Sequence, residues 1–113
     1  MDSLVQLNVG GVYFPTRRQT LSCNETFFAG VLRAHPECFE IFIDRDPTHF
    51  RYVLNWLRGA RCLPEDEISL RELLCEADYY SMADMRDAIV HAKDRHSWQK
   101  SLRDIADELR QAR

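Results

Sequence analysis

Residues 4–16 read LVQLNVGGVYFPT, and the architecture predicted for the rest of the chain builds on this segment. Leucine and valine alternate there with glutamine and asparagine, and this period of two indicates a half-buried β-strand. Gly10 and Gly11 follow between two β-rich runs, which is typical of a tight hairpin because primed turns need positive φ angles. Pro15 cannot donate to a neighbouring strand, so we expect it at a sheet edge or near a strand end. The chain is therefore predicted to open with a β-hairpin.

A helix and a third strand are predicted downstream of the hairpin. Asn24 is a good N-cap, and apolar residues follow it at helical spacing from Phe27 to Leu32. This helix should end at His35, since the residue before a proline avoids the helical region. Residues 39–43 then read FEIFI, and this run of aromatic and β-branched residues indicates a short strand.

Capping signals predict the helices that follow. Asp46 can cap the first of them, Pro47 suits its first position, and Gly59 closes it. Residues 69–72 (SLRE) have the spacing of a capping box, and residues 81–84 (SMAD) have a related pattern, so two further helices are expected. The order ββ-α-β-α-α-α describes an α+β fold: a small mixed sheet, made of the N-terminal hairpin and a further strand, covered by helices.

A last amphipathic helix is predicted from Ser97 onward. Its apolar stripe repeats at spacings of four, three and four residues, the a/d rhythm of a coiled-coil seam: Trp98, Leu102, Ile105 and Leu109. A lone helix of this length is marginal in water, so the stripe should be buried on its own domain, on a neighbouring copy or on a partner. Residues 1–96 are accordingly expected to form one domain and residues 97–113 a C-terminal helical tail.

Composition narrows the classes of function. The 113 residues suit one domain, and 15 Lys+Arg against 18 Asp+Glu give a net charge of −3, which argues against a nucleic-acid groove. The longest apolar run, residues 27–32, is far shorter than the roughly 20 residues of a membrane span. The N-terminus has neither the positive segment nor the apolar core of a signal peptide, so a cytoplasmic or nuclear location is expected.

The cysteines and histidines do not have the spacing of a metal site. Cys23, Cys38, Cys62 and Cys75 include no Cys-x-x-Cys pair, and the four histidines add no zinc-finger half-site. In a reducing compartment disulfides are disfavoured, so we expect free thiols that are buried or half-buried as small apolar side chains. No metal and no cofactor are predicted.

The most charge-dense short motif is Asp44-Arg45-Asp46. Two carboxylates could share acid–base work, but Arg45 between them should lower their pKa values by pairing rather than raise one for catalysis. Gly10-Gly11 lacks the lysine and the following helix of a phosphate loop. We therefore expect no catalytic residues and no enzyme.

Charge is unevenly distributed along the chain. Residues 37–78 contain ten acidic residues and five arginines, whereas Arg17, Arg18 and Arg33 lie upstream of them. Such asymmetry suits head-to-tail self-association, in which one face of a subunit meets a different face of the next. A solvated turn is the plainer explanation for Arg17 and Arg18.

Five motifs in this order and spacing resemble the BTB domain of the potassium-channel tetramerisation type. They read LNVGG (7–11), TRRQTL (16–21), FIDRDP (42–47), FRYVLNWLR (50–58) and LCEADYY (74–80). Such domains occur in voltage-gated potassium channels and in soluble potassium-channel-tetramerisation-domain (KCTD) proteins. The resemblance covers residues 4–92. EADYY at residues 76–80 is more similar to the soluble members, and the paired cysteines of the channel zinc site are missing.

The resemblance implies a protein-protein interaction module without catalysis. Family members assemble into rings of four or five copies, and many soluble ones dock onto cullin-3 to recruit substrates for ubiquitin transfer. The soluble-type motifs favour a ring of five and a role as a cullin-3 ubiquitin ligase adaptor. The alternative is the cytosolic assembly domain of a voltage-gated potassium channel, or a regulator that co-assembles with one.

Matching positions imply two groups of site residues. The oligomer interface is expected to include Asn8, Gly10, Gly11, Arg17, Arg18, Gln19, Asp44, Arg45 and Asp46. The cullin-binding residues are expected to be Leu63, Glu65 and Tyr79. Plainer roles stay open for some: the glycines make the turn, Asp46 caps a helix, and Tyr79 packs in the core. Arg45 is expected to pair with a carboxylate of its own chain or of a neighbour.

Overall fold

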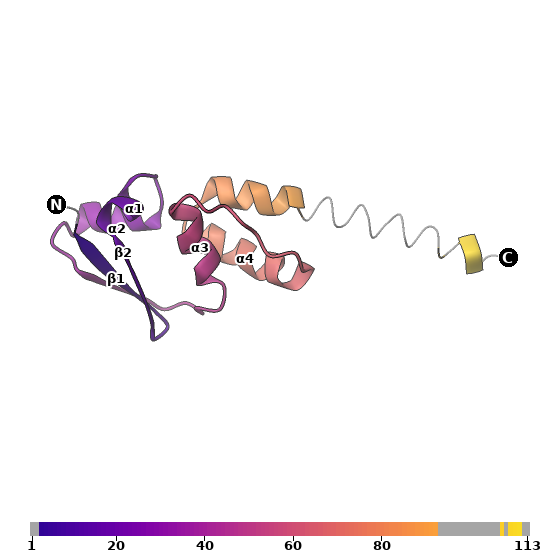
Figure 1. Ribbon diagram of the computed structural model, residues 1–113, viewed down its shortest axis with the longest axis horizontal. Coiled ribbons are helices and arrows are strands. Elements are labelled where there is room, and N and C mark those ends of the chain that lie inside the picture. Colours follow the sequence, from indigo (N-terminus) through magenta and orange to yellow (C-terminus); the bar gives the residue numbers. More distant parts are fainter. Residues whose placement is uncertain (1–2, 93–106, 108, 112–113) are drawn as a thin grey trace.

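The computed structural model describes residues 3–92, 107 and 109–111, and it begins with the predicted hairpin (Figure 1). Strands β1 (Leu4–Val9) and β2 (Val12–Arg17) pair in antiparallel fashion, with Val9 opposite Val12. Gly10 and Gly11 form the two-residue loop and have φ angles of 57° and 99°. These are the positive values that a primed turn requires, so the prediction is confirmed.

A third strand, β3 (Glu40–Ile43), completes a mixed sheet of order β2-β1-β3. It runs parallel to β1, with Leu7 opposite Ile41. Pro15 lies on β2, an edge strand, where its missing N–H costs no ladder bond, as predicted. The α+β class with a small mixed sheet is therefore confirmed.

Two helices connect β2 to β3, although only one was predicted. The short helix α1 (Arg18–Ser22) directly follows β2, and α2 (Phe27–Ala34) comes after it. The predicted N-cap Asn24 is wrong, because Thr26 occupies that position. The Phe27 N–H, one of the donors left unpaired at a helix start, bonds instead to the Tyr80 carbonyl at 2.9 Å. The helix ends at His35 as expected.

The helix α3 (Phe50–Leu57) starts later than its capping signal indicated. Asp46 does not cap it, since its carboxylate accepts the Thr48 N–H at 2.9 Å in a local turn and His49 takes the N-cap position. The predicted end is confirmed: Gly59 has a φ of 98° and donates to the Trp56 carbonyl at 3.0 Å. Ala60 donates to Asn55 at 2.9 Å, which completes a Schellman motif.

The helix α4 (Glu67–Tyr79) begins earlier than the predicted capping box. Asp66 is its N-cap and accepts the Ser69 N–H at 2.8 Å, so Ser69 donates where it was expected to cap. A further helical segment covers residues 83–92, as predicted, but Ser81 ends α4 rather than capping that segment. Ser81 has a φ of 57° and donates to the Asp78 carbonyl at 3.1 Å.

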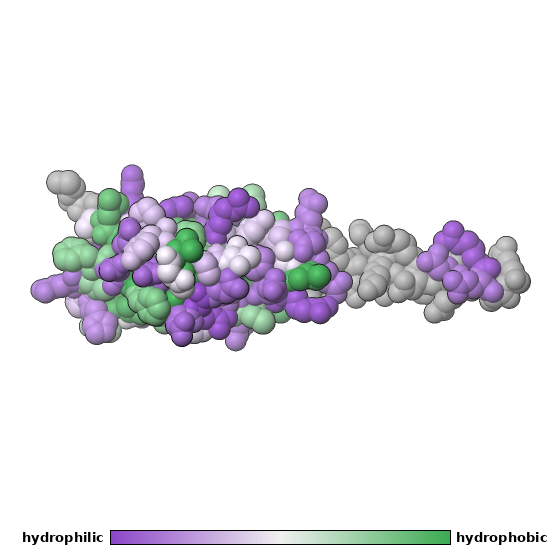
Figure 2. All heavy atoms as spheres, turned by 90° about the horizontal axis from the view of Figure 1, so that it is seen from below, coloured by the Kyte–Doolittle hydropathy of each residue, from purple (hydrophilic) through white to green (hydrophobic). Residues whose placement is uncertain are grey.

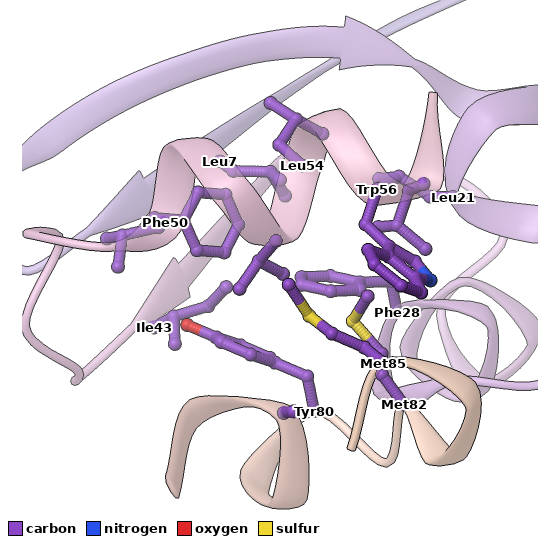
Figure 3. Packing of buried hydrophobic residues seen from close by; sticks show 14 of the residues in the cluster. Leu7, Leu21, Phe28, Ile43, Phe50, Leu54, Trp56, Tyr80, Met82 and Met85 are labelled. Atoms are coloured by element: carbon purple, nitrogen blue, oxygen red, sulfur yellow. The ribbon is translucent and has the colours of Figure 1, made fainter. Parts of the chain in front are cut away.

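The helices cover one face of the sheet and enclose a single buried cluster (Figure 3). Val5, Leu7 and Val9 point into it from β1, as do Ile41 and Ile43 from β3. At its centre the fully buried Tyr80 ring stacks on Phe28, with centroids 5.0 Å apart. The packing of this core determines which side chains of the sheet and the helices face outward.

The cysteine side chains are more accessible than expected. Cys23, Cys62 and Cys75 are exposed and only Cys38 is half-buried, so the prediction of buried thiols is wrong for three of the four. The physical reason is their placement, because Cys23 and Cys62 lie in connecting segments and Cys75 lies on the outward face of α4.

The predicted tail falls largely outside the described residues. Trp98, Leu102 and Ile105 lie outside them, while Leu109 is 62% exposed. The boundary at residue 96 and the three destinations of the apolar stripe therefore stay predictions. Among the described residues, no helix is both long and apolar enough to cross a membrane.

Candidate interaction surface

The hairpin turn lies against the loop that follows β3. Because β1 and β3 are parallel, the C-terminal ends of both strands lie side by side at one end of the sheet. There the Gly10 N–H donates to the Ile43 carbonyl at 2.9 Å. A Cβ at Gly10 would lie 2.5 Å from the Arg45 carbonyl oxygen, so only glycine permits this approach. The Asn8 side chain accepts the Gly11 N–H at 2.8 Å and fixes the turn.

Arg45 joins this loop to α4. Its guanidinium donates to the carboxylate of Glu76, and its Cζ lies 4.5 Å from the centroid of the Tyr79 ring. The Glu76 side chain is only 10% exposed, so loss of Arg45 would leave a largely buried carboxylate without its partner. The hydrogen bond to Glu76 raises the pKa of Arg45. The expected pairing of Arg45 with a carboxylate is confirmed within the same chain, and its part in assembly stays a prediction.

An acidic groove of about 390 Å³ opens between this loop and α4. Its lining consists of Asp44, Arg45, Asp46, Thr48, His49, Glu72, Cys75 and Glu76. Within it, His49 contacts Glu72 at 3.0 Å while Arg45 pairs with Glu76. Asp44 and Asp46 are both exposed, and hydrogen bonds from Thr48 lower the pKa of Asp46. The groove therefore presents net negative charge.

The predicted basic residues lie at the opposite end of the sheet. Arg17 ends β2 and pairs with Leu4, the first residue of β1. Arg18 begins α1 and donates through Nε to the Ser3 hydroxyl at 3.2 Å. Gln19 follows it on α1. The six residues of β1 separate this basic corner, Arg17–Gln19, from the acidic groove by about 20 Å.

The predicted interface residues thus form two groups. Asn8, Gly10, Gly11 and Asp44–Asp46 are brought together at the turn, and Arg17–Gln19 are placed at the other end. Two separate groups are compatible with the predicted head-to-tail self-association, in which one face of a subunit meets a different face of the next.

The structure does not bring the three predicted cullin-binding residues into one patch. Leu63 is half-buried against the core, and Glu65 precedes the N-cap of α4. Tyr79 lies at the C-terminus of this 13-residue helix, about 20 Å away. It is 41% exposed, and its ring packs on Phe27 with centroids 5.4 Å apart. Tyr79 therefore has both a packing role and an accessible edge.

Sequence reasoning missed the roles of two carboxylates, Glu76 and Asp84, whose polar contacts hold these elements together. Glu76 lies three residues after Leu73 and four before Tyr80, so it falls on the buried face of α4. A carboxylate on an apolar stripe is a signal that a partner is needed. Asp84 accepts the Trp56 indole N–H at 3.2 Å and pairs with Arg61, and no spacing rule indicates this contact.

Comparison with known proteins shows which domain family and which relatives this sequence resembles. The sequence pattern of the BTB/POZ domain matches residues 5–88. The FH protein interacting protein FIP2 of Arabidopsis thaliana is 39% identical over 100 residues, which cover 79% of this chain and 33% of that protein. Human BTB/POZ domain-containing protein KCTD5 is 38% identical over 90 residues, covering 72% and 38%.

A third relative has the same kind of domain in a much longer chain. Human BTB/POZ domain-containing protein KCTD3 is 41% identical over 85 residues, which cover 70% of this chain and 10% of that protein. The chain spans about a third of the length of FIP2 and KCTD5. The similarity therefore concerns one domain of each relative.

Proposed function

Since the chain belongs to the BTB/POZ domain family of the potassium-channel tetramerisation type, we propose that it is a homo-oligomeric adaptor for a cullin-3 ubiquitin ligase. Domains of this type are interaction modules rather than enzymes. The proposed adaptor assembles as a ring of four or five copies, with five favoured, and presents several copies of an attached segment in the cytoplasm or nucleus.

The observation that carries the proposal is the separation of opposite charges to opposite ends of one sheet. Asp44 and Asp46 line the acidic groove, and Arg17 is exposed at the basic corner. A groove on one copy that receives the basic corner of the next repeats the same contact around a ring. Complementary potentials of this kind also select the correct partner surface.

Support for cullin-3 as the partner comes from the soluble-type motif and from Tyr79. Aromatic residues with an accessible edge are common anchors of protein interfaces, and Arg45 beneath the ring holds it in place. Leu63 and Glu65 lie at the far end of α4, so a partner that contacts all three residues must lie along this helix.

The alternative is the cytosolic assembly domain of a potassium channel, or a regulator that co-assembles with one. It predicts the same ring without cullin binding. The continuation of the gene separates the two, because six hydrophobic spans downstream favour a channel and a soluble continuation favours the adaptor.

Two measurements on the purified chain test the proposal. Light scattering at micromolar concentration should give the mass of four or five copies, and a monomer would contradict it. Immobilised cullin-3 N-terminal domain should retain the wild type. Glu65→Arg should bind more weakly than Asp87→Arg, a matched reversal at an exposed residue of the segment 83–92. If the chain forms a ring but immobilised cullin-3 does not retain it, the adaptor proposal is wrong and the assembly-domain alternative is favoured.

A further inference from the structure

A second pocket lies at the basic corner, and its lining includes two arginines and two threonines. Its volume is about 440 Å³, and it is lined by Leu4, Pro15, Thr16, Arg17, Thr20 and Arg58. Thr20 follows Arg17 by three residues at the start of α1, so both side chains reach the same pocket. Hydrophilic side chains project at this end of the molecule, beside hydrophobic ones (Figure 2).

Arg58 reaches this pocket from a distant part of the chain. It directly follows α3, and its Nη2 donates to the Pro15 carbonyl at 2.8 Å. Its Nη1 lies 3.5 Å from the Asn55 side-chain oxygen. These contacts hold the guanidinium at the edge of β2, in the same pocket as Arg17 and Thr20. Two guanidinium groups that line one pocket favour a group with several negative oxygens between them, such as a phosphate.

The sequence around Thr20 has the charge pattern of a kinase acceptor. Residues 17–21 read RRQTL, so arginines stand three and two residues before the Thr20 hydroxyl. Kinases distinguish their substrates by such patterns, and an arginine-directed serine/threonine kinase pairs these arginines with carboxylates of its substrate cleft. Thr20 is half-buried in α1, a helix of five residues without a side-chain hydrogen bond at its N-cap. A local opening of this one short helix therefore exposes the acceptor.

The acceptor pattern and the pocket are independent observations that meet at one hydroxyl. We propose that Thr20 is phosphorylated by an arginine-directed serine/threonine kinase and that Arg17 and Arg58 bind the resulting phosphate. In this step the Thr20 hydroxyl oxygen attacks the γ-phosphorus of a nucleoside triphosphate, the bond from that phosphorus to the β,γ-bridging oxygen breaks, and the nucleoside diphosphate leaves. The hydroxyl proton passes to a base of the kinase. The phosphate carries a charge of about −1.5 to −2 and three acceptor oxygens, which suffice for both guanidinium groups.

The consequence of this modification is loss of the charge on which the proposed contact between copies depends. The phosphate offsets the positive charges of Arg17 and Arg58, so the basic corner no longer complements the acidic groove of the next copy. The unmodified chain assembles and the phosphorylated chain stays apart. Because the ring covers Arg17–Gln19, the kinase acts on the chain before assembly. The inference rests on the proposed homo-oligomerisation and assigns its regulation.

Kinase treatment of the dilute purified chain tests the acceptor and its effect. The catalytic subunit of protein kinase A with Mg-ATP should phosphorylate Thr20, which fragmentation mass spectrometry locates. After concentration, light scattering should show a dissociation constant of the oligomer raised about tenfold or more, as expected when a charged contact is lost. Thr20→Val is the matched control, because it lacks only the hydroxyl and keeps both arginines. Treated in the same way, it should assemble like the untreated wild type.

Three outcomes would contradict the inference, and one of them reaches further. An unmodified Thr20, or a phosphorylated chain that assembles like the untreated one, would overturn the regulation and leave the proposed oligomer intact. Equal dissociation of the treated wild type and the treated Thr20→Val would place the effect at another acceptor and overturn it as well. An untreated wild type that stays monomeric would contradict the proposed function together with the inference.

A phosphorus NMR titration of the phosphorylated chain tests the pocket without reference to assembly. Neighbouring guanidinium groups stabilise the dianion, so the second pKa of the phosphate should fall below its ordinary value of about 6. Arg58→Met should return this pKa toward the ordinary value. Arg51→Met, at an exposed arginine of α3 outside the pocket, should leave it lowered. An unshifted pKa in the wild type, or equal values in the two variants, would overturn the binding of the phosphate by Arg58.

Discussion

At the scale of single residues, Tyr80 carries an unmatched polar group into the centre of the core. Its hydroxyl is buried, and no residue of the described chain provides a hydrogen-bond partner. Figure 3 shows the hydroxyl end of the ring directed toward Ile43, an apolar neighbour. Burial raises the pKa of Tyr80, and the nearby charge of Glu76 raises it further, so the phenol stays protonated. A buried donor without an acceptor costs about 1–3 kcal/mol.

Tyr80→Phe should therefore be neutral or raise the free energy of unfolding by up to about 1 kcal/mol, because the unpaired hydroxyl is lost and the ring contacts remain. Tyr80→Ala should lower it by about 3–5 kcal/mol through the cavity that it creates. Urea denaturation measures both. A loss of more than about 1 kcal/mol in Tyr80→Phe would show that the hydroxyl has a partner.

At the scale of helices, α3 and α4 end in the same geometry with different residues. Gly59 and Ser81 each occupy the left-handed position after a helix, with φ angles of 98° and 57°. Each donates its N–H back into the last turn of its helix, and the following residue closes the longer bond. The left-handed conformation is unfavourable for residues with a Cβ, so Ser81 is under strain that Gly59 avoids.

The two sites provide a matched pair of substitutions. Ser81→Gly should raise the free energy of unfolding by about 0.5–1 kcal/mol, because glycine adopts this conformation without a steric cost. Gly59→Ser should lower it by about 1 kcal/mol for the same reason in reverse. Thermal unfolding followed by circular dichroism compares them. Destabilisation by Ser81→Gly would mean that the serine side chain contributes more than its backbone strain costs.

These two ends also show why helix boundaries were unequally predictable. Gly59 could be assigned from sequence because few residues other than glycine end a helix in this way. Helix starts were misplaced at Asp46 and Ser69, since polar residues that can cap are frequent and only the tertiary structure selects one. The helix α1 was missed because five residues are too few for a periodic pattern.

At the scale of the whole molecule, sequence motifs identified the candidate interface residues, but the fold decides how they are distributed. The turn and the loop 44–46 meet because β1 and β3 are parallel, which a strand pattern alone does not specify. Arg45 could be expected to pair, but Glu76 lies 31 residues away, and only the packing of α4 selects it. The separation of Arg17 from Asp44 likewise became visible only once the register was known.

That separation leads to a prediction about assembly that charge reversal can test. Arg17→Glu places two acidic groups at each proposed contact, and Asp44→Arg places two basic groups there, so each variant alone should lose the oligomer. High salt should partly restore each, because repulsion between exposed charges is screened. Light scattering measures the mass. Arg86→Glu changes the net charge as much as Arg17→Glu, at an exposed residue that belongs to neither the acidic groove nor the basic corner, so it should keep the wild-type mass.

Mixing the two charge-reversed variants then tests head-to-tail geometry and ring size together. Wherever copies alternate, one contact pairs the glutamate at position 17 of the first variant with the arginine at position 44 of the second, and the next pairs the native Arg17 and Asp44. A ring of four can alternate completely, so the mixture should recover the wild-type mass. A ring of five must contain one contact between identical variants, so the mixture should instead form even-numbered or open assemblies. Native mass spectrometry distinguishes these results, and single variants that keep the wild-type mass would refute the head-to-tail contact.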